Sequence, residues 1–110
     1  CALVVRGGVA YLATVGDSKG IVGRVTKAGA RTSTHLLLES VDHKPDDDGE
    51  RAFIESRGGV VKFSGGGIAR IYRSGKGYPG LATSRAFGDG SLSIDDIIRH
   101  DPSVIRVDLQ

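Results

Sequence analysis

Residues 9–18, with the sequence VAYLATVGDS, decide how this chain begins to fold. The first seven of them are rich in β-branched and aromatic side chains, which is typical of a β-strand. A second strand-like run, Ala2 to Val5, precedes them across two glycines, so the two runs predict a β-hairpin. Apolar residues resume from Ile21 to Val25. The intervening Gly16-Asp17-Ser18 is therefore predicted to form a turn between two strands.

The middle of the chain combines a polar stretch, a short strand and one helix. Residues Thr26 to His35 are polar and predict a loop, and Leu36 to Leu38 predict a short strand. The helix is expected from Asp46 to Arg57, because Asp47 can cap it and Glu50, three residues later, completes a capping box. A glycine follows the last helical residue and is a typical stop signal.

Glycine divides the second half of the chain into short segments. Val60 to Phe63 and Val104 to Leu109 predict strands. The stretch from Ser64 to Gly80 predicts a mobile basic loop around a short strand, Ala69 to Tyr72. A helical turn is expected at Asp95 to Ile98. Glycine supplies 17 of the 110 residues, in pairs and triplets that would divide short strands, and this favours β-rich structure with tight turns.

Composition limits the class of protein. A length of 110 residues fits one domain, and 39% hydrophobic residues can form a core. The chain has no membrane-length apolar run and opens with no signal sequence, so we expect an intracellular protein, cytoplasmic or nuclear, without a membrane partner. One cysteine makes no internal disulfide and offers no zinc site. A net charge of +2 with scattered arginines argues against nucleic acid. Because methionine is absent, we expect a piece of a longer protein.

Two aspartates stand in glycine turns that follow predicted strands or core segments. Asp17 lies in Gly16-Asp17-Ser18, and Asp89 lies in Gly88-Asp89-Gly90. Mg²⁺ takes oxygen ligands and is often held by one or two carboxylates together with waters, so both side chains are candidate metal ligands. Aspartate is also a favoured turn residue. Considered separately, neither motif decides between a metal site and a simple turn.

Four blocks of sequence in register carry more information than either aspartate. They are YLATVGDS at residues 11–18, DHKP at 42–45, ERAFIE at 50–55 followed by GGVV at 58–61, and PGLATSRAFGD at 79–89. Together they closely resemble the metal-dependent serine/threonine phosphatases of the 2C type (PP2C). The resemblance implies an α+β fold, a four-layer α-β-β-α sandwich of two antiparallel sheets flanked by helices, with a two-metal centre at one edge. Residues 1–110 would form the central portion of one such domain, incomplete at both ends.

The resemblance also implies roles for individual residues. Asp17 matches an aspartate that binds a metal directly or through water. Supporting and packing roles beneath the active site are implied for Gly16, Ser84, Arg85, Gly88 and Asp89. Residues 64–80 take the place of the family's flap, a variable segment beside the cleft, and the side chains expected to contact substrate there are Arg70, Tyr72, Arg73 and Lys76. A solvated glycine loop is the alternative for this segment. His43 is expected to have a structural role.

The function implied by the resemblance is hydrolysis of phosphoserine and phosphothreonine in proteins by metal-activated water. The cofactors would be two or more Mg²⁺ or Mn²⁺ ions in the complete domain, and the partners would be phosphorylated proteins and the remainder of the phosphatase domain. The remaining ligands of the metal centre would lie outside residues 1–110, so we expect this piece alone to be inactive. The alternative is a catalytically inactive relative that acts as a binding or regulatory scaffold.

Overall fold

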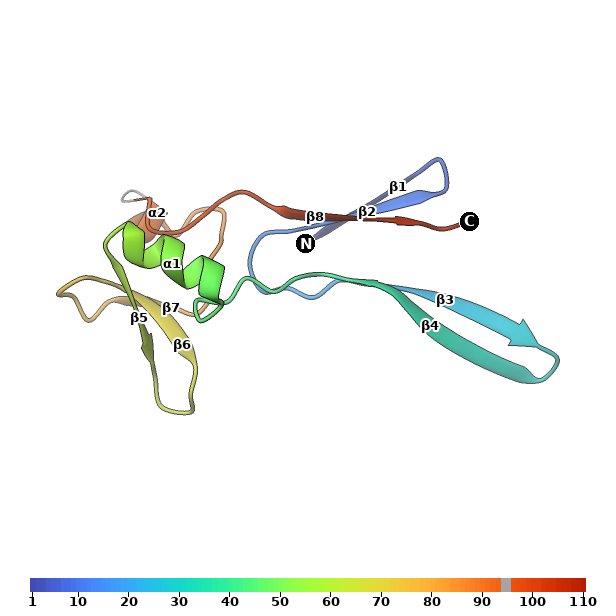
Figure 1. The fold of residues 1–110 in the computed structure, drawn as a ribbon, viewed down its shortest axis with the longest axis horizontal. Helices are drawn as coiled ribbons and strands as arrows, with labels where there is room; N and C mark the ends of the chain where they lie inside the picture. The colour runs from blue at the N-terminus through green and yellow to red at the C-terminus, as the bar shows by residue number, and fades with distance from the viewer. Residues whose placement is uncertain (94–95) are drawn as a thin grey trace. The chain divides into compact units, whose positions relative to one another are not determined.

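The structure is a computed structural model and describes residues 1–93 and 96–110 (Figure 1). These residues form two compact units, and the chain passes between them more than once. Unit 1 comprises residues 1–14, 18–41 and 102–110. Unit 2 comprises residues 15–17 and 42–101, and it holds the helices and most of the sequence blocks described above.

Unit 1 contains a three-stranded antiparallel sheet in the order β1-β2-β8. The strands are β1 (Ala2–Arg6), β2 (Val9–Thr14) and β8 (Ser103–Asp108). The predicted hairpin at the start of the chain and the predicted final strand are both confirmed. Successive side chains of a strand point to opposite faces, and in β2 alternate residues are buried. These buried residues are Ala10, Leu12 and Thr14.

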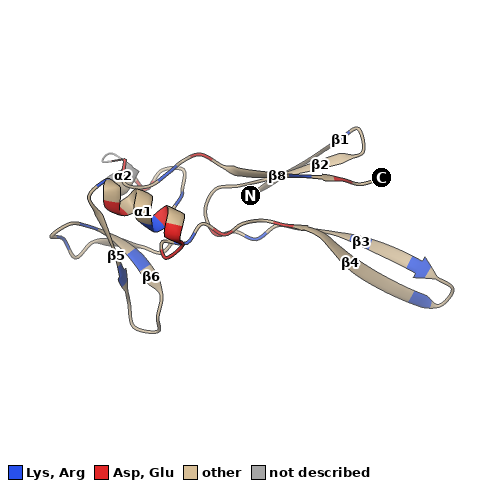
Figure 2. Cartoon of the chain, viewed as in Figure 1, with Lys and Arg blue, Asp and Glu red and all other residues tan. Residues whose placement is uncertain are grey.

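The second sheet of unit 1 is a long antiparallel hairpin of β3 (Ile21–Ala28) and β4 (Arg31–Glu39). The prediction of a loop from Thr26 to His35 is therefore wrong. Its β-branched residues favour strand even though they are polar, and Thr26 pairs with Ser33 across the hairpin through hydroxyls 2.6 Å apart. Lysine and arginine side chains mark the end of β3 and the start of β4 (Figure 2).

In unit 2, helix α1 (Asp48–Ser56) lies within the predicted range 46–57 and starts directly after the predicted cap, Asp47. The Asp47 carboxylate accepts hydrogen bonds from the backbone N–H groups of Gly49 and Glu50 at 3.0 and 3.3 Å, which satisfies two of the helix's unpaired donors. Gly58 follows with φ of +82°, the left-handed conformation typical of a helix stop. The reciprocal half of the predicted capping box is absent, because the Glu50 side chain turns into the interior of unit 2 and binds Arg85.

Helix α1 packs against a three-stranded antiparallel sheet in the order β5-β6-β7 (Figure 1). The strands are β5 (Gly59–Phe63), β6 (Ala69–Arg73) and β7 (Pro79–Leu81). The short strand predicted at 69–72 is confirmed, but the surrounding segment is not simply a loop, because β7 adds a third strand. β5 must start with glycine, since a Cβ at Gly59 would lie 2.6 Å from the side chain of Ile54.

Apolar side chains between α1 and this sheet form the core of unit 2. Its buried members are Ile54, Val61, Ala69, Ile71, Leu92, Ile97 and Ile98. The short helix α2 (Gly90–Ser93) contributes Leu92. The helical turn predicted at 95–98 begins at Asp95, which lies outside the described residues, and Ile97 and Ile98 are not helical. No helix among the described residues has the length and apolar character needed to cross a membrane.

Candidate functional site

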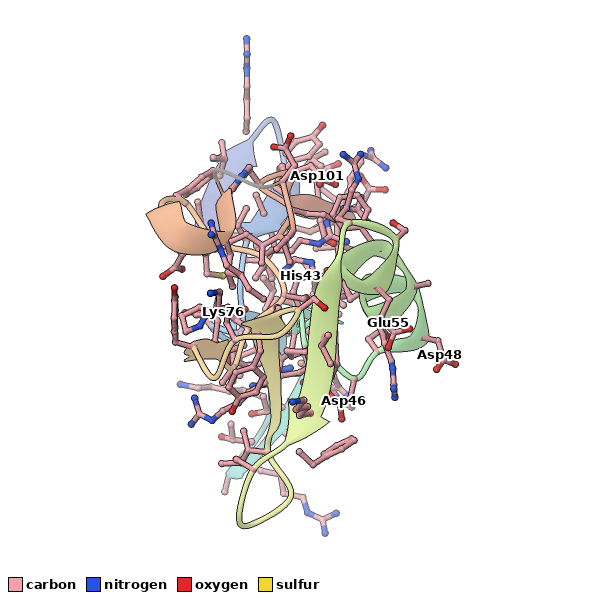
Figure 3. The ribbon with its side chains drawn as sticks, turned by 90° about the vertical axis from the view of Figure 1, so that its left-hand side faces the viewer. His43, Asp46, Asp48, Glu55, Lys76 and Asp101 are labelled. Carbon is pink, nitrogen blue, oxygen red and sulfur yellow. The ribbon has the colours of Figure 1, made fainter. Side chains whose placement is uncertain are left out.

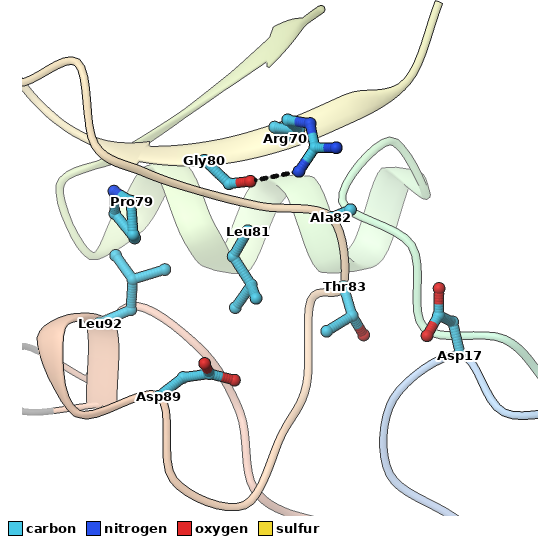
Figure 4. Close-up of a pocket in the computed structure, with 9 residues that line it drawn as sticks. All are labelled: Asp17, Arg70, Pro79, Gly80, Leu81, Ala82, Thr83, Asp89 and Leu92. Carbon is cyan, nitrogen blue, oxygen red and sulfur yellow. Dashed lines mark hydrogen bonds between the residues drawn. The ribbon is translucent and has the colours of Figure 1, made fainter.

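A pocket of about 430 Å³ in unit 2 brings the two candidate carboxylates to one place (Figure 4). Asp17 enters it from the turn after β2, and Asp89 enters from the loop before α2. The other lining residues are Arg70, Pro79, Gly80, Leu81, Ala82, Thr83 and Leu92. The structure therefore unites residues that are 72 positions apart in the sequence (89 minus 17).

The turn that presents Asp17 depends on the glycine before it. Gly16 has φ of +102°, which side-chain-bearing residues rarely adopt. A Cβ at this position would also lie 3.3 Å from the carbonyl oxygen of Arg85. The Asp17 side chain is 41% exposed, and its Oδ2 accepts a hydrogen bond from the Lys44 ammonium at 2.5 Å. A small residue at position 16 thus lets the carboxylate emerge close to the 83–85 segment.

His43 ties this turn to the rest of unit 2. Its side chain is buried, and Nδ1 accepts a hydrogen bond from the Gly16 N–H at 3.1 Å. Its own backbone N–H donates to the Gly16 carbonyl at 2.9 Å, and its carbonyl accepts from the Ser84 N–H at 3.0 Å and from the Thr83 hydroxyl at 3.1 Å. His43 thereby connects the Asp17 turn to the 83–84 segment.

The electrostatics of His43 match this arrangement. Burial lowers the pKa of the imidazole below its ordinary value of 6.5, and the nearby Arg85 charge lowers it further. A neutral ring is needed, because only an unprotonated Nδ1 can accept the Gly16 hydrogen bond. The neutral tautomer therefore carries its proton on Nε2.

Ser84 and Arg85, which follow the pocket residue Thr83 in the sequence, form a buried hydrogen-bonded network with Glu50. The Ser84 hydroxyl donates to Glu50 Oε2 at 2.6 Å, and Arg85 Nε donates to both carboxylate oxygens at 3.1 and 3.0 Å. Burial raises the pKa of Glu50, but hydrogen bonds from Arg85 and Ser84, together with the charges of Arg85 and Arg99, outweigh burial and lower that pKa overall. Glu50 is therefore ionised inside unit 2.

The network continues from Arg85 toward the residues before β8. Arg85 Nη1 donates to the carbonyl of Asp101 at 3.0 Å and to its carboxylate at 3.1 Å. Arg99 also binds the Asp101 carboxylate, at 2.6 Å, and stacks over the Phe53 ring at 5.5 Å. The sequence marked Arg85 as a supporting residue but missed Glu50, Arg99 and Asp101. The one available signal was Glu50's position, one turn before the core residue Ile54.

Asp89 is held in a less common backbone conformation. Its φ is +53°, and its carbonyl accepts a hydrogen bond from the Leu92 N–H at 2.9 Å. Gly88 before it has φ of +89°, and a Cβ there would meet no atom within 4 Å. Asp89 thus reaches the pocket from an open loop, whereas Asp17 is fixed by a dense set of hydrogen bonds.

Of the four predicted substrate-contacting residues, Arg70 lines the pocket. Its Nη1 donates to the Gly80 carbonyl at 2.6 Å (Figure 4). Tyr72 instead lies beneath the Lys62 ammonium, which is 5.9 Å from the ring centroid. Arg73 ends β6, and Lys76 is exposed in the connection to β7 (Figure 3).

The donor set of the pocket suits one kind of metal ion. No group of three or more His, Cys, Asp or Glu side chains is arranged around a metal position among residues 1–93 and 96–110. Mg²⁺ and Mn²⁺ need no such group, because one or two carboxylates and several waters suffice for Mg²⁺ and oxygen ligands also suit Mn²⁺. Asp17 and Asp89, facing one open pocket, fit a hydrated ion of this type.

Comparison with known proteins places this chain in a family. The model of the protein phosphatase 2C family matches residues 1–110. Probable protein phosphatase 2C 17 of Arabidopsis thaliana is 42% identical over 91 residues, which are 83% of this chain and 27% of that protein. Probable protein phosphatase 2C 74 of Oryza sativa subsp. japonica is 38% identical over 91 residues, again 83% of this chain but 19% of that protein.

A solved structure agrees with these matches. The serine-threonine phosphatase 2C from Toxoplasma gondii superposes with a TM-score of 0.72 at 26% identity, covering 98% of this chain and 36% of that one. This chain belongs to the protein phosphatase 2C family, and its antiparallel sheets and helix form a part of the PP2C fold. The family is generally metal-dependent. The chain spans about a quarter or less of the length of the two plant relatives.

Proposed function

We propose that the catalytic domain containing this chain hydrolyses phosphoserine and phosphothreonine in proteins, using Mg²⁺ or Mn²⁺. The observation that carries the proposal is the pocket in which Asp17 and Asp89, both from blocks resembling PP2C, face one space. The names of the similar proteins support it, since the plant relatives are probable protein phosphatases and the Toxoplasma gondii protein is a serine-threonine phosphatase.

In this proposal, Asp17 holds a divalent ion directly or through water, and Asp89 supports the same cluster from the opposite loop. Such ions supply neutralisation of the phosphoryl charge and activation of a water molecule for attack on phosphorus. His43 orients the Asp17 turn, and the network of Glu50 and Arg85 fixes the segment to which His43 is bound. These residues therefore set where the carboxylate stands.

We propose that Arg70, which lines the pocket, binds the substrate's phosphate. A guanidinium carries five N–H donors, so its hydrogen bond to the Gly80 carbonyl leaves other donors for phosphoryl oxygens. Charge-assisted bonds of this type are strong and directional. Because Arg73 and Lys76 lie in the outer part of the same segment, we propose that they contact the substrate peptide rather than the phosphate.

The test uses the complete catalytic domain that contains this chain, assayed on a phosphothreonine peptide with and without Mn²⁺. Mn²⁺-stimulated turnover is expected for the wild type. D17N should lower kcat about tenfold or more, as loss of a group at a metal site commonly does. The matched control is D48N, which removes an exposed carboxylate on the outer side of α1 (Figure 3), and it should leave kcat unchanged.

Melting temperatures separate a catalytic effect from a structural one. Asn keeps the shape of the turn, so D17N should shift the melting temperature by no more than a few degrees, the scale of about 1 kcal/mol in a domain of this class. Unchanged turnover together with a clearly lower melting temperature would make Asp17 a turn residue only. Absence of any Mn²⁺-dependent turnover in the wild type would favour an inactive scaffold.

A further inference from the structure

The Asp17 carboxylate already has a cationic partner in the structure. Lys44 Nζ lies 2.5 Å from Asp17 Oδ2, and the two side chains are 46% and 41% exposed. The backbone around Lys44 is anchored on both sides, because the His43 carbonyl accepts two hydrogen bonds and the Lys44 carbonyl accepts one from the Asp47 N–H at 3.2 Å. The ammonium is therefore delivered to this carboxylate by a fixed segment.

An ammonium and a divalent ion cannot both occupy the same carboxylate oxygen without mutual repulsion. A metal that binds Asp17 through that oxygen must displace Lys44, and the displaced charge remains a few ångströms from the dication. The free energy needed to break the Lys44–Asp17 ion pair is modest, because both side chains are nearly half exposed and water screens their charges.

The structure also offers the displaced side chain another place. Lys44 lines a separate hollow of about 240 Å³ together with Asp46, Gly67, Ile68, Ala69 and Ala82. A flexible lysine stem can turn from Asp17 toward Asp46 without moving the anchored backbone. Displacement therefore lets the ammonium move toward a hollow that a second acidic residue also lines.

We propose that Lys44 is a built-in competitor for the divalent cation at Asp17. The ammonium neutralises the carboxylate while the metal is absent, and it raises the metal concentration at which this position fills. This inference rests on the proposed metal role of Asp17, but it predicts a property of metal binding rather than of turnover. Lys44 thus sets the threshold at which the site responds to Mg²⁺ or Mn²⁺.

The experiment measures Mn²⁺ binding to the complete catalytic domain by the electron paramagnetic resonance signal of free Mn²⁺. K44M keeps the apolar stem and removes the charge, and it should tighten the Mn²⁺ binding step that depends on Asp17 about three- to tenfold, the range expected for a half-exposed pair and its repulsion of a dication. K44R keeps the charge and should lie closer to the wild type than K44M does.

Two controls localise the effect. R51M removes one positive charge of matched exposure, 45%, from an ion pair on α1, and it should not change Mn²⁺ affinity. D17N should abolish or greatly weaken one Mn²⁺ binding step, which identifies the step that depends on Asp17, and in this background K44M should produce no tightening. If R51M tightened Mn²⁺ binding as much as K44M does, the effect would be one of net charge in general. If K44M still tightened Mn²⁺ binding in the D17N background, Lys44 would act at a position other than Asp17. Either result, or unchanged or weaker binding by K44M alone, would overturn the inference.

The outcomes distinguish this inference from the proposed function. If the wild type binds Mn²⁺ and K44M tightens it while no phosphopeptide is hydrolysed, the competitor role of Lys44 stands and the phosphatase proposal fails. If hydrolysis is observed but K44M leaves Mn²⁺ affinity unchanged, only the inference about Lys44 fails. If D17N leaves all Mn²⁺ binding unchanged, Asp17 is no ligand and the inference fails with it.

Discussion

Replacing Arg85 by Met should destabilise the domain more than any single change in a surface ion pair. The Arg85 and Glu50 side chains are only 10% and 7% exposed, and the substitution would leave the Glu50 carboxylate buried without its main partner. Breaking a buried pair from one side costs about 3–5 kcal/mol. Glu50 would retain the Ser84 hydroxyl at 2.6 Å and Arg99 at 3.5 Å. We therefore expect R85M to lower the unfolding free energy by about 3 kcal/mol, near the lower end of that range.

The assay is urea unfolding of the complete catalytic domain followed by circular dichroism, with linear extrapolation of the unfolding free energy. R51M serves as control, because it breaks a surface i,i+4 pair of 45% and 48% exposure that water screens, so it should cost far less stability than R85M. The double variant E50Q/R85M replaces the unpaired carboxylate with an amide, which costs less to bury. It should be at least about 1 kcal/mol more stable than R85M.

Acidification gives an independent check on the same pair. In the wild type the pKa of Glu50 is lowered below its ordinary value of 4.5, so its contribution to stability is present above that pH and is lost as pH falls through the folded-state pKa. Without Arg85, burial would dominate and raise the pKa of Glu50, so R85M should gain relative stability on acidification. The difference in unfolding free energy between the wild type and R85M should therefore become smaller from pH 7 to pH 4. The reasoning would be refuted if R85M lowered the unfolding free energy by less than about 1 kcal/mol at pH 7, or if its difference from the wild type did not change with pH.

Three further outcomes are expected. Because burial lowers the pKa of His43, the unfolded chain binds the extra proton first, so the free energy of unfolding should fall as pH drops below 6.5. Urea unfolding between pH 8 and 5 should show this dependence on pH. H43N, whose amide oxygen can accept the Gly16 hydrogen bond, should make the dependence weaker. R70Q should raise KM for both an acidic phosphopeptide and p-nitrophenyl phosphate, whereas R73Q/K76Q should raise it for the peptide alone; equal effects on both substrates would place all three residues at the phosphate. Residues 1–110 expressed alone should show no Mn²⁺-stimulated hydrolysis of p-nitrophenyl phosphate, and measurable turnover would contradict the proposed need for ligands elsewhere in the domain.

Local sequence signals predicted much of the fold because the elements they describe are stabilised locally. The Asp47 cap and the left-handed Gly58 mark the ends of α1 within a few residues of the helix itself. The strand alternation of β2 is visible in its own six residues. The hairpin of β3 and β4 was missed, because its polar threonines and serine suggest a loop unless cross-strand pairs such as Thr26 with Ser33 are considered.

The candidate site was predictable only in part, for a related reason. Asp17 and Asp89 stand in recognisable turns, so their exposure could be expected from the sequence. Glu50 and Arg85 are 35 positions apart, and nothing in the neighbourhood of either indicates that they pair. An acid in the first turn of a helix has a sufficient local explanation in the helix dipole, and that explanation concealed the buried ion pair.

The hydrogen bonds of unit 2 explain why the four sequence blocks occur together. The Asp17 turn is bonded to His43 of the second block, His43 is bonded through its carbonyl to Ser84 of the fourth, and Ser84 donates to Glu50 of the third. Each link joins two blocks, and none involves the reacting groups. Because interior segments are close-packed and transmit strain, we expect a substitution at Glu50 to displace the Asp17 carboxylate through these links. Loss of turnover after a substitution at Glu50 or Ser84 would therefore report the position of the Asp17 carboxylate, not chemistry performed by Glu50 or Ser84.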